Sequence, residues 1–138
     1  MKFGTKRSKV LDSWGLMALF QDEKPAAGKM EDILTQAHET GLALMITTIN
    51  LGEIWYSTAR VRSATEADER VTDVVKLGIE VVSADWALAR EAARFKSRGK
   101  LSYADCFALA LAKWRKAELV TGDVEFKPFD GEVKIIWL

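Results

Sequence analysis

Apolar and polar residues along this chain are grouped in blocks that predict strands alternating with helices. The continuous apolar run LALMIT, at 42–47, is typical of a strand buried on both faces. Strands are predicted at residues 7–11, 42–47, 80–82, 117–120 and 133–137. Helical spacing of apolar residues predicts helices at 14–20, 26–39, 65–77, 85–98 and 102–114, with a further helix opening at 50–53.

Residues at the expected helix ends have the chemistry of caps. Ser102 is a candidate N-cap that places an acid at the third helical position, and Ser83 is a candidate cap for the helix at 85–98. Thr48 or Asn50 is expected to cap the helix that opens at 50–53. The helix after Ser102 is apolar nearly all round, which predicts burial on most sides. Other residues expected on inward helix faces are Ile54, Trp55, Thr58, Ala59, Trp86, Ala89, Ala92, Ala93 and Phe95.

This order of elements predicts an α/β protein with a mostly parallel sheet covered by helices on both faces. A length of 138 residues suits a single domain, 1–138, with its own hydrophobic core. In open sheets of this kind, ligands bind at the carboxyl ends of the strands. The residues that follow each strand are therefore the first candidates for a functional site.

Composition indicates where such a protein works. With 49% hydrophobic and 29% charged residues, the chain resembles an ordinary globular protein. Its single cysteine, Cys106, excludes an internal disulfide and suits a reducing compartment. No apolar run approaches the roughly 18 residues of a membrane span, and the segment 1–14 lacks the apolar centre of a signal peptide. We therefore expect a cytoplasmic protein with no membrane partner.

Charge is balanced over the chain but uneven along it. Lysine plus arginine and aspartate plus glutamate number 20 each, so no global field favours nucleic acid. Between residues 86 and 116, however, eight basic residues accompany only two acidic ones. Solvated outer faces of two helices explain this excess, and so does a basic surface beside an acidic pocket.

Four acidic residues follow predicted strands or open predicted helices at one edge of the sheet. They are Asp12, Glu53, Asp105 and Asp123. Each alone has a simpler explanation as a helix cap, a capping-box partner or a turn residue. Those roles do not explain why all four should gather at the same end of the sheet.

Carboxylates brought together in a partly dry cleft repel one another, and a divalent cation removes that cost. Oxygen ligands without a His or Cys cluster suit Mg²⁺ or Mn²⁺ better than zinc. Such ions lower the pKa of a bound water and neutralise charge on a phosphodiester. The pattern of acids therefore favours nuclease chemistry.

The segments KVLDS, INLGEIWY, LSYADCFALALA and LVTGD, in this order and spacing, resemble the PIN domain, and more specifically the small VapC-type toxins of toxin–antitoxin pairs. The resemblance extends from Val10 to the last predicted strand. It implies a three-layer α/β/α, Rossmann-like fold with a mostly parallel central sheet. It also implies a metal-dependent endoribonuclease that hydrolyses RNA phosphodiester bonds, with tRNA or another structured RNA as substrate. The implied partners are a second copy in a homodimer and a cognate antitoxin whose tail covers the pocket.

By this resemblance, Asp12, Glu53, Asp105 and Asp123 take the positions of the family's acidic metal-binding quartet. It implies that Asp12 and Asp105 bind Mg²⁺ or Mn²⁺ directly and that Asp123 is a ligand or holds a coordinated water. Glu53 is then a ligand or the group that orients the attacking water.

Ser13 and Thr121 match small hydroxyl positions beside the pocket of the family that the chain resembles, and Asn50 is expected to bridge cap and pocket in the same way. There they either support carboxylates by hydrogen bonds or bond locally in caps and turns. Trp14 and Gly15 depart from the small residue that commonly follows the Asp-Ser pair.

The departures leave two further questions about single side chains. Trp14 is expected either to limit access to the cleft or to pack in the core. Glu125 is either a further site acid or an exposed loop residue.

Other functions fit less of the sequence. A phosphoaspartyl or phosphatase domain also gathers acids at strand ends, but Trp14 occupies the second acidic position of its Asp-x-Asp pair. A Cys-His dyad is not expected, because Cys106 has the setting of a small buried hydrophobe and His38 that of a surface residue. A catalytically silent PIN-fold module that acts through dimerisation or partner capture remains the alternative from another class.

Overall fold

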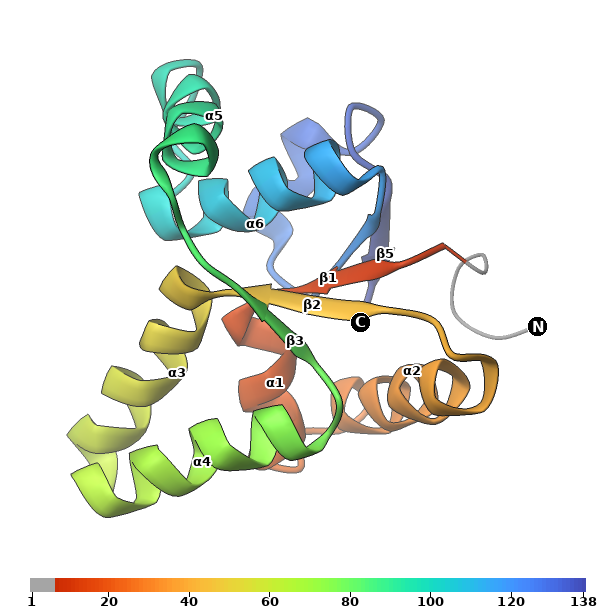
Figure 1. Ribbon diagram of the computed structural model, residues 1–138, viewed down its shortest axis with the longest axis vertical. Coiled ribbons are helices and arrows are strands. Elements are labelled where there is room, and N and C mark those ends of the chain that lie inside the picture. Colours follow the sequence, from red (N-terminus) through yellow and green to blue (C-terminus); the bar gives the residue numbers. More distant parts are fainter. Residues whose placement is uncertain (1–6) are drawn as a thin grey trace.

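The central element of the structure, a computed structural model that describes residues 7–138, is a parallel sheet (Figure 1). Residues 1–6, part of the segment searched for a signal peptide, lie outside the described residues. The strands occur in the order β3-β2-β1-β4-β5. Their bounds are β1 Lys9–Leu11, β2 Leu44–Thr47, β3 Glu80–Val82, β4 Glu118–Thr121 and β5 Ile135–Trp137. Every neighbouring pair is parallel, which confirms the predicted sheet.

Helices cover both faces of this sheet. Their bounds are α1 Ser13–Phe20, α2 Ala26–Thr40, α3 Thr48–Val61, α4 Ala64–Lys76, α5 Trp86–Ser97 and α6 Tyr103–Arg115, and the 3-10 helix η1 spans Val124–Phe129. Figure 1 shows α5 and α6 on one face and α1 to α4 on the other. This arrangement is the three-layer α/β/α fold that the family resemblance implied, while η1 was not predicted.

Neighbouring residues of each strand enter different cores. Val10, Met45 and Leu119 pack with α5, α6 and η1, because successive strand side chains point to opposite faces. Leu11 and Val120, one position further along, pack with α1, α2, α3 and α4. Burial on both faces explains why the strands are apolar throughout and not alternating.

Two predicted caps are wrong. Helix α3 begins at Thr48, two residues earlier than expected, and its N-cap is Thr47, whose side chain accepts from the Asn50 backbone N–H. Helix α5 is capped by Asp85 in place of Ser83. In both cases the capping side chain accepts from the backbone N–H three residues further along the chain. Several polar residues near each helix start have the right chemistry for this role, so the sequence alone does not select one of them. The predicted Ser102 cap is confirmed.

Several side chains expected to face inward are exposed. Trp86 is 74% exposed because α5 packs through Leu88, Ala92 and Phe95, and Trp86 lies outside that stripe. Ala93 is exposed for the same reason. Trp55 is 37% exposed and donates its indole N–H to Asp68 across the α3–α4 hairpin. The spacing of apolar residues within single helical turns therefore predicts buried faces that are wider than those in the structure.

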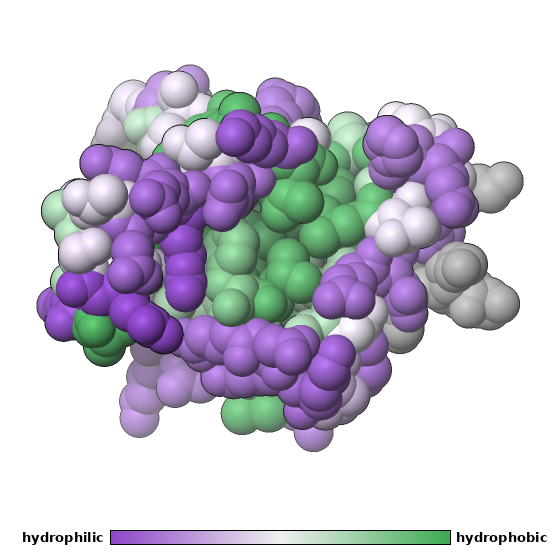
Figure 2. Space-filling view, turned by 90° about the horizontal axis from the view of Figure 1, so that it is seen from below, coloured by the Kyte–Doolittle hydropathy of each residue, from purple (hydrophilic) through white to green (hydrophobic). Residues whose placement is uncertain are grey.

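The face of the molecule formed by α2 and α4 contains an apolar hollow. Figure 2 shows hydrophobic side chains in this hollow with hydrophilic side chains around it. Between the end of α2 and the turn after α4, a pocket of about 380 Å³ is lined partly by Leu34, Leu42 and Leu77.

None of the helices within residues 7–138 has the length and apolar content needed to cross a bilayer.

Candidate functional site

Asp12 occupies the carboxyl end of β1 and is 1% exposed. It is the N-cap of α1, where its Oδ1 accepts from the Gly15 backbone N–H at 3.0 Å. Its Oδ2 accepts a short hydrogen bond from the Thr121 hydroxyl at the end of β4. Asp12 is thus both a cap and a link between two neighbouring strands.

Glu53 approaches the same edge from the first turns of α3. Its Oε1 accepts from the Ser13 hydroxyl at 3.0 Å and from Asn50 Nδ2 at 3.2 Å. Asn50 is fully buried, and Nδ2 also donates to the Ala104 carbonyl at the start of α6. The capping-box alternative for Glu53 is wrong, because Thr47 is the N-cap and Glu53 bonds across the pocket instead.

Three further carboxylates come together beside Glu53. One oxygen from each of Asp105, Asp123 and Glu125 can be chosen so that all three lie within 4.8 Å of one another. Asp105 is in the first turn of α6, and Asp123 caps η1 by accepting from the Glu125 backbone N–H at 2.9 Å. Glu125 is exposed, yet the turn of η1 brings it back to the acids.

A pocket of about 320 Å³ joins these groups. Its lining includes Glu53, Asp105 and Asp123 together with Trp14. Trp14 lies over Gly122, where an added Cβ would be 2.2 Å from a carbon of the indole ring. Trp14 therefore lines the pocket entrance and does not pack in the core, and glycine at 122 provides the space for its ring.

The site raises the pKa of two of its acids. Burial raises the pKa of Asp12 to about 7, against the hydrogen bonds from Thr121 and Gly15, and nearby Asp105 and Asp123 add to the rise. Burial also raises the pKa of Asp105 to about 6, with further contributions from Glu53, Asp123 and Glu125. Burial first, and the neighbouring carboxylates in addition, thus make the ionised forms of these two acids unfavourable.

These donors fit a hard divalent cation. Mg²⁺ takes oxygen ligands at about 2.1 Å, so two ligands on opposite sides of one ion lie about 4.2 Å apart. The spacing within 4.8 Å of Asp105, Asp123 and Glu125 oxygens is close to that requirement. The raised pKa of Asp105 means that its negative charge is unfavourable in this site, and a bound cation would offset that charge.

The pKa values predict how metal-free stability depends on pH. An unfolded aspartate ionises with a pKa of about 3.9, whereas the folded chain holds protons on Asp12 up to about pH 7 and on Asp105 up to about pH 6. The folded state therefore binds more protons in this interval, and its free energy of unfolding falls as pH rises from about 4 to 7. Urea denaturation in EDTA at several pH values measures the slope. Asp12→Asn should show a smaller decline, and an unchanged slope in that variant would contradict the assignment.

The sequence matches the PIN domain family over residues 9–132, and the chain belongs to that family. No curated protein sequence matches it. Among solved structures, it resembles VapC20 of Mycobacterium tuberculosis, described as a toxin that cleaves the sarcin–ricin loop, with 16% identity and a TM-score of 0.70. That alignment covers 88% of this chain and 94% of VapC20.

Two structures of VapBC proteins have the same fold. The DNA-bound VapBC of Salmonella typhimurium gives a TM-score of 0.73 at 14% identity, covering 94% of this chain and 96% of that one. VapBC-5 of Mycobacterium tuberculosis gives 0.62 at 20% identity, covering 95% and 98%. At these identities the likeness concerns the fold.

The structure brings all four predicted acids to the same edge of the sheet, where Glu53, Asp105 and Asp123 line the pocket and Asp12 does not. Asp12 lies beneath the pocket with its oxygens engaged, while Asp105 and Asp123 line the pocket and share their group with Glu125. The exposed-loop interpretation of Glu125 missed this contact, because no sequence pattern indicated η1. Glu23, on the turn after α1, also lines the pocket and had no signal in the sequence. Cys106 is buried and His38 exposed, as predicted.

Proposed function

We propose that this chain is a VapC-type toxin, a metal-dependent endoribonuclease that hydrolyses RNA phosphodiester bonds. The observation that carries the proposal is the meeting of the Asp105, Asp123 and Glu125 carboxylates at the carboxyl edge of a PIN-family sheet. Acids gathered in this way are unfavourable without a cation, as the raised pKa of Asp105 indicates. A divalent ion and a phosphodiester together balance that charge.

The proposed chemistry divides the residues by position. Asp105, Asp123 and Glu125 present the oxygens for Mg²⁺ or Mn²⁺, which when bound supplies positive charge to the phosphodiester and to the leaving oxygen. Among residues 7–138, Glu53 accepts two hydrogen bonds, both at Oε1, from Ser13 and Asn50. This leaves Glu53 Oε2 to orient an attacking water and accept its proton.

Asp12 has a different role in this proposal. Its two oxygens hold Gly15 and Thr121, and the Thr121 hydroxyl in turn accepts from the Asp123 backbone N–H at 3.0 Å. Asp12 therefore fixes the position of Asp123. Its negative charge also contributes to the field that attracts a cation, once it is ionised.

The direct test is incubation of the purified protein, free of any antitoxin, with total cellular RNA in Mg²⁺, Mn²⁺ or EDTA. Discrete cuts that need the metal would support the proposal and would identify the RNA, with tRNA or another structured RNA as the expected class. A folded protein that cuts no RNA with either metal would favour the catalytically silent binding module.

Metal binding should also be measurable without activity. We expect Mg²⁺ or Mn²⁺ to raise the melting temperature, because an ion that binds only the folded state stabilises it by about 2.7 kcal/mol at 100 times its dissociation constant. Differential scanning calorimetry of the wild type and an Asp105→Asn, Asp123→Asn variant measures the effect. The variant should respond little, and equal shifts in both proteins would show that the ion binds elsewhere.

The proposed partners are a second copy of the chain and a cognate antitoxin. Support for the antitoxin comes from the fold, which is shared with a structure described as a toxin–antitoxin complex and with one described as a member of a family of toxin–antitoxin systems. The apolar hollow between α2 and α4 offers a surface on which such a protein can bury hydrophobic side chains (Figure 2). Analytical ultracentrifugation of the chain alone tests the homodimer.

A further inference from the structure

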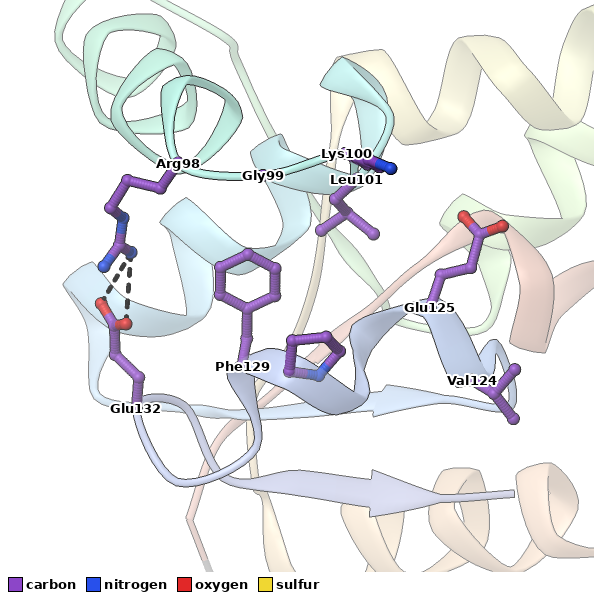
Figure 3. A pocket seen from close by; sticks show the side chains of 9 residues that line it. Arg98, Gly99, Lys100, Leu101, Val124, Glu125, Phe129 and Glu132 are labelled. Atoms are coloured by element: carbon purple, nitrogen blue, oxygen red, sulfur yellow. Dashed lines mark hydrogen bonds and ion pairs between the residues drawn. The ribbon is translucent and has the colours of Figure 1, made fainter.

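A second and larger pocket lies beside the acidic group. It has a volume of about 550 Å³ and is formed by the α5–α6 connection and η1 (Figure 3). Its apolar lining includes Leu101, Pro128 and Phe129, and Lys100 and Glu125 belong to its polar lining. A volume between about 300 and 1,000 Å³, mostly apolar walls and a few polar groups are typical of small-ligand sites.

Glu125 connects this pocket with the acidic group. It lines the pocket, and its carboxylate is also one of the three whose oxygens lie within 4.8 Å of one another. In Figure 3 the Glu125 side chain extends from η1 at the side of the pocket away from Arg98 and Glu132. A chain-like ligand whose phosphate lies at the acids can therefore continue directly into the pocket.

The two cationic side chains of the pocket, Arg98 and Lys100, differ in whether an acidic side chain already binds them. Arg98 is held by Glu132 through contacts of 3.2 and 3.1 Å, and its guanidinium lies 5.0 Å from the centre of the Phe95 ring. Lys100 is exposed, and within residues 7–138 its ammonium group has no hydrogen bond or ion pair. Lys100 is therefore the cation available to a ligand.

We propose that this pocket binds one unpaired ribonucleotide next to the cleaved phosphodiester, with its base against Phe129, Pro128 and Leu101 and a phosphate at Lys100. The inference rests on the proposed nuclease function. Single-stranded RNA is recognised by aromatic rings under its bases and by cations along its backbone, and this pocket supplies both.

Charge favours RNA over a peptide as the occupant. A cationic peptide segment suited to the acidic group would meet the like charge of Lys100 as it entered the pocket. RNA avoids that conflict, because its phosphate is attracted to Lys100 directly and to the acids through a divalent ion. The Phe129 ring, packed edge-on to Phe95 at 5.6 Å between ring centres, is held in place for stacking.

Three substitutions test separate parts of the pocket. Lys100→Gln removes the cation, and Phe129→Leu removes the ring while keeping an apolar side chain. Gly99→Leu fills the pocket, because a Cβ at 99 would lie 3.7 Å from the Phe129 ring at ordinary contact distance. Lys76→Gln, on exposed α4, and Gly28→Leu, where an added Cβ meets no atom within 4 Å, are the matched controls. Melting temperatures establish that each variant is folded.

The measurement is fluorescence anisotropy of labelled oligouridylate and oligoadenylate, about ten nucleotides long, with Ca²⁺ in place of Mg²⁺. Phe129→Leu and Gly99→Leu should weaken binding about tenfold, the effect of losing one stacked base. Lys100→Gln should lower the slope of log affinity against log salt by about 0.7, the value for one phosphate contact on a single strand. Inorganic polyphosphate should bind the wild type and the Phe129→Leu variant equally, because it has no base.

Other outcomes separate this inference from the proposed function. Metal-dependent RNA cleavage by the wild type together with unchanged RNA affinity in all three pocket variants would overturn the nucleotide site and leave the nuclease intact. Unchanged RNA affinity with weakened antitoxin binding would assign the pocket to a protein partner and also overturn it. If the wild type neither cuts nor binds RNA, the proposed function fails first, and the nucleotide site fails with it.

Discussion

Replacing Asp105 by asparagine should lower the rate of RNA cleavage at least about 100-fold, since even residues that only support metal ligands contribute about 10- to 100-fold. Asp105 belongs to the acidic group with Asp123 and Glu125 and lines the pocket. The fold should survive, because the raised pKa of Asp105 shows that the ionised carboxylate is unfavourable where it lies. Initial rates on a mapped RNA substrate and a melting curve of the same sample measure both effects.

A matched control separates loss of the site from general damage. Asp73→Asn makes the same chemical change on the exposed surface of α4, away from the pocket, and should leave the rate unchanged. In EDTA at about pH 8, Asp105→Asn should be at least as stable as the wild type, because it removes a charge that burial and the neighbouring carboxylates disfavour. Full activity in Asp105→Asn would refute its role, and a loss of both stability and activity would indicate a structural one.

The largest stability change is expected at the other end of the sheet. Lys9 and Glu118 are neighbours in register on β1 and β4, with Lys9 Nζ 3.1 Å from Glu118 Oε1, and both are almost completely buried. Glu118→Leu leaves the Lys9 charge buried without this carboxylate, which should cost about 3–5 kcal/mol of unfolding free energy. At about 3 °C per kcal/mol for a chain of this size, the melting temperature should fall by about 10 °C or more.

Two comparisons identify the cause of that loss. The double variant Lys9→Met, Glu118→Leu removes both charges and should recover much of the stability, because replacing a buried ion pair by apolar groups is often close to neutral. Asp22→Asn breaks the exposed pair with Lys24, whose side chains are 74% and 65% exposed, and should change stability by no more than about 1 kcal/mol. A double variant that is no more stable than Glu118→Leu would contradict the ion-pair explanation.

The helices and strands were largely predictable because burial on both faces leaves a direct mark on composition. The apolar run at 42–47 became β2, and the nearly all-apolar segment after Ser102 became the buried α6. Predictions that depended on a single side chain were less accurate. Trp86 is as apolar as any core residue, yet it is exposed because α6 covers only one stripe of α5.

The same division applies to the candidate site. The sequence by itself determined the fold class and the PIN family. Apolar strands that alternate with helices indicate the fold class, and the order and spacing of the acidic segments match the family. Only the tertiary structure decided how the acids divide: Asp12 is sealed beneath the pocket by Thr121 and Gly15, while the exposed Glu125 joins Asp105 and Asp123. The reason is physical. Which carboxylates meet depends on through-space distances set by the sheet register and by η1, and spacing along the chain does not contain those distances.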